Sequence, residues 1–110
     1  MIVCTLSLTL SAPDRRKVIA SLRPLIGSTR AQPGCRVCSL LVDAEDARRL
    51  VLWQEWDSQD QLARHLGSED YRLVLAAIEM SQEAPQVHFD TVAARGGLEV
   101  VEAARTPPTR

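Results

Sequence analysis

Residues 2–10 read Ile-Val-Cys-Thr-Leu-Ser-Leu-Thr-Leu, and this stretch says most about the fold. Its larger apolar residues recur at every second position, which is the period of a β-strand with one buried face. The positions between them hold Val3, Thr5, Ser7 and Thr9, which are small and weakly polar. A sheet face in contact with water usually carries more strongly polar side chains. We therefore expect something to cover this second face.

Working outward, the same alternation predicts three more strands, at residues 35–42, 48–56 and 86–94. Apolar residues three and four positions apart predict a helix before the second strand and a helix pair at residues 58–66 and 68–81.

The first of these helices begins after Ser11, a typical N-cap residue, and its apolar stripe runs to Ile26. Pro24 lies inside this stripe. Because proline removes a backbone hydrogen bond, it predicts a kink or a break at that point.

The predicted order of elements is strand, helix, strand, strand, helix pair, strand. This is the ferredoxin-like split βαβ arrangement of the α+β class, a four-stranded antiparallel sheet with its helices on one face. We expect a single domain over residues 1–104 and a disordered tail over residues 105–110. For residues 98–103 the sequence leaves two alternatives open: a short fifth strand that extends the sheet, or a segment that crosses to a partner.

The uncovered face of the predicted sheet is too apolar to remain in water. The third strand places Val51, Trp53 and Glu55 on that face. Burial of Trp53 alone is worth roughly 2–3 kcal/mol. Two such sheets packed face to face provide the simplest cover, so we expect a symmetric homodimer with these three residues at its interface. For Glu55 we expect an ion pair across this interface, with Arg36 or Arg49.

Charge and hydropathy exclude two classes of partner. The chain has 13 basic and 14 acidic residues, a net charge of -1, whereas a nucleic-acid surface needs a clear basic excess. The longest apolar run, residues 73–78, is far shorter than the roughly 20 residues of a membrane span. We expect neither nucleic acid nor a membrane as a partner.

The 3 cysteines cannot form a closed disulfide framework. Together with a start that lacks the features of a secretory signal, this favours a reducing, cytoplasmic location. Cys35 and Cys38 form a C-x-x-C pattern, but it leads into a strand, where residues three apart point to opposite faces about 10 Å apart. We therefore expect buried structural thiols and no metal site.

Three motifs, in this order, carry a resemblance to a known family. Pro33-Gly34-Cys35 forms a turn before the second strand, Glu55-Trp56 ends the third strand, and His65 follows nine residues later with Ser68 close behind. The chain resembles the antibiotic biosynthesis monooxygenase family of the dimeric α+β barrel superfamily over most of residues 1–94. The resemblance implies the ferredoxin-like fold and a homodimer built sheet to sheet.

The resemblance also implies an activity. Family members oxidise electron-rich aromatic molecules with O2 and use neither metal nor flavin, so the implied function is a cofactor-independent monooxygenase acting on a small aromatic quinol or phenolic. The pocket would lie between helices and sheet, with Trp56 and His65 as catalytic residues. The implied substrate-binding residues are Leu6, Leu52, Tyr71, Val74 and Ile78.

Each of these residues also has a purely structural interpretation. Trp56 can anchor the core, His65 can bond within the helix pair, and Tyr71 can be a core residue. The resemblance implies haem degradation only for a branch of the family that uses an asparagine and a haem-ligating histidine on the long helix. This chain has no asparagine and residues 68–81 contain no histidine, so haem degradation is disfavoured. The alternatives to an enzyme are a non-catalytic small-molecule-binding or stress-related homodimer and a purely structural dimerisation module. The sequence does not name a substrate.

Overall fold

The protein is described by a computed structural model that covers residues 1–107. Four strands form one antiparallel sheet in the order β2-β3-β1-β4, which confirms the predicted ferredoxin-like α+β fold. In chain order the elements are β1 (Ile2–Thr9), α1 (Ala12–Arg30), β2 (Cys35–Val42), β3 (Arg49–Trp56), α2 (Gln59–Leu66), the 3-10 helix η1 (Glu69–Tyr71), α3 (Arg72–Glu79), β4 (Gln86–Thr91) and α4 (Leu98–Arg105).

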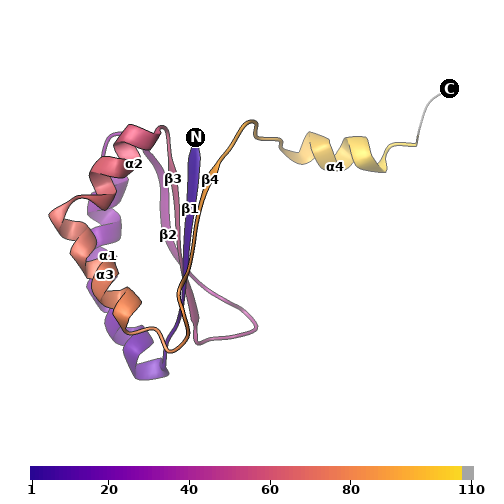
Figure 1. Ribbon diagram of the computed structural model, residues 1–110. Helices are drawn as coiled ribbons and strands as arrows, with labels where there is room; N and C mark the ends of the chain where they lie inside the picture. The colour runs from indigo at the N-terminus through magenta and orange to yellow at the C-terminus, as the bar shows by residue number, and fades with distance from the viewer. Residues whose placement is uncertain (108–110) are drawn as a thin grey trace.

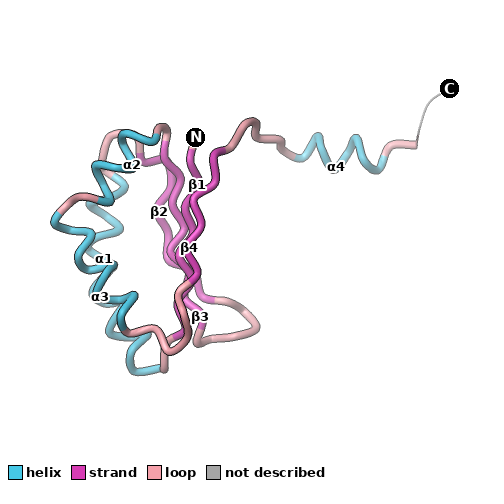
Figure 2. The backbone as a smooth tube through the Cα atoms, viewed as in Figure 1, coloured by secondary structure: helices cyan, strands magenta, loops and turns pink. Residues whose placement is uncertain are grey.

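The helices cover the sheet unequally. Figures 1 and 2 show α1, α2 and α3 on one face of the sheet, whereas α4 projects from the other side, away from the rest of the domain. We call the helix-covered side the inner face and the opposite side the outer face. The described part of the chain contains no helix long and apolar enough to cross a membrane.

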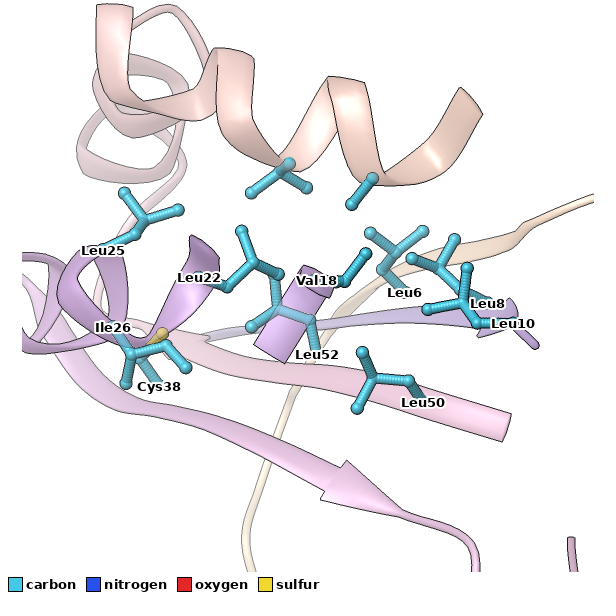
Figure 3. Close-up of a cluster of buried hydrophobic side chains, with 12 residues drawn as sticks. Leu6, Leu8, Leu10, Val18, Leu22, Leu25, Ile26, Cys38, Leu50 and Leu52 are labelled. Carbon is cyan, nitrogen blue, oxygen red and sulfur yellow. The ribbon is translucent and has the colours of Figure 1, made fainter. Parts of the chain in front are cut away.

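The main core lies between the inner face and the helices. Figure 3 shows leucines of β1 and β3 meeting the apolar stripe of α1. A smaller cluster of Ile2, Cys4, Trp56 and Leu62 fills the end of the sheet below α2. Every second side chain along β1 and most of β3 is buried toward the helices, as the alternation in the sequence predicts.

Helix α1 runs from Ala12 to Arg30 without interruption, so of the kink or break predicted at Pro24 the break is wrong. Pro24 and Ala20 both lie on the exposed side, where water can satisfy the carbonyl that the proline ring leaves free. On the opposite side Leu22 and Ile26 are buried in the core, which holds the helix on the sheet through this point.

The two cysteines of the C-x-x-C pattern also depart from expectation. The ladder between β2 and β3 is irregular between Cys35 and Val37, so that Cys35 pairs with Trp56 and Cys38 with Gln54. Trp56 and Gln54 are two residues apart on β3 and therefore share a face of the sheet. Because each cysteine lies beside one of them, both cysteines point to the inner side instead of to opposite sides. All three thiols are free, and burial raises the pKa of Cys38 to about 11.

Other boundaries shift as well. Residues 98–103 belong to helix α4, so a fifth strand is not formed. The predicted helix over residues 68–81 is a turn of 3-10 helix followed by the shorter α3, and β4 ends at Thr91. Arg105 is the last residue of α4, and residues 108–110 of the expected tail lie outside the described residues.

Candidate functional site

A cluster of buried polar and aromatic side chains lies where β3 ends under α2. Gln54 and Trp56 point to the inner face from β3, and His65 reaches down from the last turn of α2. The rings of Trp56 and His65 stack with their centroids 4.9 Å apart, and the Tyr71 ring meets His65 edge-on at 5.4 Å. Trp56 and His65 are 0% and 1% exposed, so the stack is sealed from solvent.

The turn before β2 helps to place α2 over this cluster. Gly34 has φ +86°, a left-handed conformation that glycine adopts without strain, and a Cβ there would collide with the side chain of Gln61. Its carbonyl accepts a hydrogen bond of 2.8 Å from Asp57 N. Ser58 then caps α2 by accepting from Gln61 N, so β2, β3 and α2 meet at one point.

The hydrogen bonds of the cluster define the proton positions. Trp56 Nε1, which can only donate, lies 2.9 Å from Gln54 Oε1. The amide nitrogen of Gln54 therefore faces His65 Nε2, at 3.4 Å. Since that amide nitrogen also can only donate, the neutral imidazole accepts at Nε2 and carries its proton on Nδ1. Within residues 1–107, Nδ1 is buried without a hydrogen-bond partner.

Burial sets the protonation of the aromatic residues of this cluster. Removal from solvent lowers the pKa of His65 below its usual value, an effect that the nearby Asp70 carboxylate partly offsets. Burial raises the pKa of Tyr71. At neutral pH the cluster thus presents a neutral imidazole and a protonated phenol, which can act as a base and as a hydrogen-bond donor.

A small pocket of about 20 Å³ adjoins the cluster, between the sheet and the α2–η1 segment. This volume holds about one water molecule. The amide of Gln54 is its most strongly polar group, and the half-exposed side chains of Val87 and Phe89 form its side at the β4 edge. The remaining lining residues are Cys4, Thr5, Leu6, Leu52, Leu66 and Tyr71.

The structure brings together only some of the residues that the sequence singled out. Leu6, Leu52 and Tyr71 line the pocket, whereas Val74 and Ile78 belong to the core further along α3. Trp56 and His65 do not line the pocket but contact Gln54 from behind it.

Sequence reasoning missed Gln54 and Phe89 as pocket residues. Gln54 is a polar residue between Leu52 and Trp56 on the apolar side of a strand, and this was the available signal. Phe89 also follows the alternation of its strand, but its place beside the pocket depends on β4 pairing with β1.

Val51, Trp53 and Glu55 lie together on the outer face, as their spacing predicts. Within the single chain Glu55 forms its ion pair with Arg95, and the expected pair across the interface with Arg36 or Arg49 stays a prediction. Trp53 Nε1 also donates to Glu55, at 2.9 Å. The hydrogen bond from Arg95, followed by that from Trp53, lowers the pKa of Glu55.

The two arginines expected to pair with Glu55 have other partners. Arg36 forms an ion pair with Asp57, and Arg49 Nη2 donates to Gln86 Oε1 at 3.4 Å. As for metal ligands, no group of three or more His, Cys, Asp or Glu side chains within residues 1–107 could hold an ion.

Comparisons with known proteins agree with the fold. A crystal structure described as that of an antibiotic biosynthesis monooxygenase is 23% identical, with a TM-score of 0.75 over 86% of this chain and 100% of that chain. Rv0793 from Mycobacterium tuberculosis is 24% identical, with a TM-score of 0.77 over 87% and 98%. PA3566 from Pseudomonas aeruginosa is 19% identical, with a TM-score of 0.71 over 84% and 94%.

No curated protein matches the chain. The sequence model of one family, antibiotic biosynthesis monooxygenase, matches residues 1–77, which include β1 through β3, α2 and the whole Trp56–Gln54–His65 cluster. The chain belongs to the antibiotic biosynthesis monooxygenase family.

Proposed function

We propose that the protein is a cofactor-independent monooxygenase that oxidises a small aromatic quinol or phenolic with O2. The observation that carries this proposal is the Gln54 amide, which lines an apolar pocket and is held from behind by Trp56 and a neutral His65. Family membership supports the coarser function, a monooxygenase.

The chemistry needs no group beyond substrate and oxygen. A deprotonated hydroquinone passes one electron to O2, and the resulting radical and superoxide combine to form a carbon–oxygen bond. The ring carbon then loses its proton, the O–O bond breaks, and water leaves. The balance is hydroquinone plus O2 to hydroxyquinone plus water, with all electrons supplied by the substrate.

The protein contributes orientation and proton transfer. Leu6 and Leu52 provide an apolar floor for the ring, and the protonated Tyr71 can donate a hydrogen bond to a substrate oxygen. His65 is the base, since its lowered pKa keeps the imidazole unprotonated. Gln54 separates His65 from the pocket, so this role requires the amide side chain to rotate aside.

The size of the pocket makes opening part of the proposal. About 20 Å³ does not admit an aromatic ring. The β4 edge, where Val87 and Phe89 are half exposed, is the side that can move with the least loss of buried contacts. The same closed pocket favours the second candidate function, a non-catalytic small-molecule-binding module, which binds a ligand here without turning it over.

Oxygen uptake separates the two candidates. Metal-free protein is mixed with a panel of benzene and naphthalene quinols, and O2 consumption is followed together with quinone absorbance. We expect uptake that falls at least about tenfold in Gln54→Leu, because leucine removes the polar group of the pocket and the hydrogen bond that positions the His65 ring before the amide rotates aside. The same substitution at the exposed Gln59 of α2 serves as the matched control and leaves the rate unchanged. A ligand-dependent rise in melting temperature without oxygen uptake supports the binding module. If the protein shows no oxygen uptake and no rise in melting temperature, both candidate functions are contradicted.

We further propose that the protein acts in the cytoplasm as a homodimer that buries the outer face. The partly exposed apolar side chains of Val3, Val51 and Trp53 on that face support this assembly. Three free thiols, two of them buried, are compatible with a reducing compartment.

A further inference from the structure

Another cavity lies at the edge of the sheet opposite the β4 edge. It is a groove of about 430 Å³ between α1 and the edge strand β2. Small-molecule sites in proteins have volumes of about 300–1,000 Å³, so this groove is large enough for one. Its apolar walls come from α1 and β2, namely from Ile19, Ile26, Leu40 and Val42. The proposed oxygenation does not use this groove.

Two arginines of α1 give the apolar groove a positive charge. Arg23 and Arg30 both line it, and because they are about two helical turns apart they lie on the same side of α1. Arg30 Nε donates to the carbonyl of Cys38 at 2.9 Å, which holds the guanidinium against β2 and leaves its two terminal nitrogens to meet an anion. Within residues 1–107 neither arginine forms an ion pair, and no acidic residue lines the groove. The groove therefore favours a negatively charged ligand.

Gly27 lies between the two arginines on the same side of α1, four residues after Arg23 and three before Arg30. Glycine inside a helix weakens the helix relative to alanine. The backbone does not require glycine here, because among the described residues only Gly34 has a positive φ. Crowding does not require it either, since outside its own helical turns no described atom lies within 4 Å of where a Cβ would be. What Gly27 does is leave open space in the groove, at the level of the two arginines.

The groove is long, because α1 and β2 lie side by side in opposite directions. Near the end of α1, Arg30 contacts Cys38 of β2. Near the start of α1, Arg15 donates to the carbonyl of Ala47, which lies beyond the end of β2. Ile19 is eleven residues before Arg30 and therefore about 16 Å from it along the helix. A groove of this length with apolar walls fits an extended hydrocarbon chain.

From these observations we propose that the groove between α1 and β2 binds a medium-chain fatty acid. The carboxylate lies over Gly27, where the terminal nitrogens of Arg30 donate two parallel hydrogen bonds to it and Arg23 adds a second positive charge. The hydrocarbon chain extends toward Ile19 between the apolar walls, out of contact with water. The proposal depends neither on the oxygenation chemistry nor on the homodimer.

Isothermal titration calorimetry of the full chain with decanoate, below the concentration at which decanoate forms micelles, tests the proposal. We expect saturable binding of one decanoate per chain. Decyltrimethylammonium, which has a decyl chain and a positive head group, should bind at least about tenfold more weakly, because the arginines repel its charge. Absence of decanoate binding, or equal affinity for the two probes, overturns the proposal.

The variant Gly27→Leu tests where decanoate binds. Its side chain fills the space over residue 27 and should raise the dissociation constant of decanoate at least about tenfold. The same side chain at the exposed Ala63 of α2, outside the groove, is the matched control and should change the constant less than about twofold. Because a Cβ at residue 27 has free space and leucine favours a helix, Gly27→Leu should melt no lower than the wild type. Unchanged decanoate affinity in Gly27→Leu overturns the proposal.

A second pair of variants tests the role of the charge. Arg23→Gln should raise the dissociation constant of decanoate about two- to fivefold, since it removes an exposed positive charge beside the carboxylate. Arg64→Gln, at an exposed position of α2 outside the groove, removes the same charge from the protein and should leave the constant unchanged. Equal effects of the two variants would mean that the net charge of the protein, and not the groove, attracts decanoate, and would overturn the proposal.

Discussion

The two faces of the sheet carry one tryptophan each, three residues apart on β3, and their surroundings are opposite. Trp56 on the inner face is 0% exposed, stacks on His65 and bonds to Gln54. Trp53 on the outer face is only partly buried, and its Nε1 donates a hydrogen bond to Glu55. The inner face is completed by the helices of its own chain. The outer face has no such cover.

This difference separates two tasks. The inner face supplies nearly all of the core of the single chain, and its polar residues are concentrated in one cluster beside a pocket. The outer face is apolar but is not covered by helices of its own chain, which is typical of a surface that another molecule covers. Chemistry is therefore expected to depend on inner residues, and assembly on outer ones.

Truncation of the two tryptophans should give the largest contrast. Trp56→Ala leaves a cavity in a sealed site and should lower the free energy of unfolding by about 3–5 kcal/mol at any protein concentration. Trp53→Ala should lower it by less, and the loss should shrink as the protein is diluted, because it acts on the association. Urea unfolding followed by circular dichroism at two protein concentrations measures both. Equal losses, independent of concentration, would show that the two faces do not differ in this way.

A charge on the outer face should break the assembly directly. Trp53→Lys places an ammonium group between two apolar sheets, and we expect the dimer dissociation constant to rise at least about 100-fold, or about 2.7 kcal/mol. Leu73→Lys, an exposed position on α3, is the matched control and should leave the dimer intact. Sedimentation velocity distinguishes the two. A Trp53→Lys variant that still sediments as the wild type does would contradict the interface.

The polar cluster on the inner face allows a smaller and more specific test. Gln54→Leu keeps the side-chain size but leaves Trp56 Nε1 and His65 Nε2 without their partner. We expect a loss of stability of about 2 kcal/mol, with the dimer unchanged. Thermal unfolding together with sedimentation tests both parts. A neutral effect on stability would mean that the hydrogen bonds inferred for the cluster are not formed in solution.

The pH dependence of stability should show the smallest effect. Burial lowers the pKa of His65 in the folded protein, so the unfolded chain takes up the proton first as the pH falls. Stability that is fully present above about pH 6.5 should therefore decline toward pH 5, by less than about 1 kcal/mol per pH unit. His65→Gln should remove this slope, whereas substitution of the exposed His88 by glutamine should not. A slope of the same size in His65→Gln would assign the effect to another group.

The strands of the fold could be predicted because their side chains alternate between two environments. Residues 2–10 and β3 carry this pattern clearly, and the order of elements then leaves few topologies. The contacts of single side chains could not be predicted. The ion pair between Glu55 and Arg95 joins segments 40 residues apart, and its geometry depends on where the chain turns after β4.

Two local predictions failed for physical reasons. Residues 98–103 contain Val100 and Val101, which favour strands, but without a neighbouring strand the helix-forming Leu, Glu, Ala and Arg residues of α4 decide the local structure. The irregularity near Cys35 lies in β2, an edge strand that pairs on one side only, and such irregularities leave little trace in the residue pattern.

The pocket was predictable only in part. Leu6, Leu52 and Tyr71 follow from strand and helix periodicity, but which of the apolar inner residues border a cavity depends on how α2 and η1 pack. Gln54 broke the apolar pattern of its strand and was the most informative residue of the site. Its role became visible only once the neighbouring donors and acceptors were in place.

The most direct test of the central claim, that a second copy covers the outer face, is the fluorescence of a Trp56→Phe variant, in which Trp53 is the only tryptophan. A dimer that buries Trp53 should give blue-shifted emission at micromolar concentration and a shift to longer wavelength on dilution, as the copies separate. A Trp53→Phe variant, which keeps only Trp56, should emit at one wavelength throughout. Emission from Trp53 that stays at the long wavelength of a water-exposed indole at every concentration would show that no second copy covers the outer face.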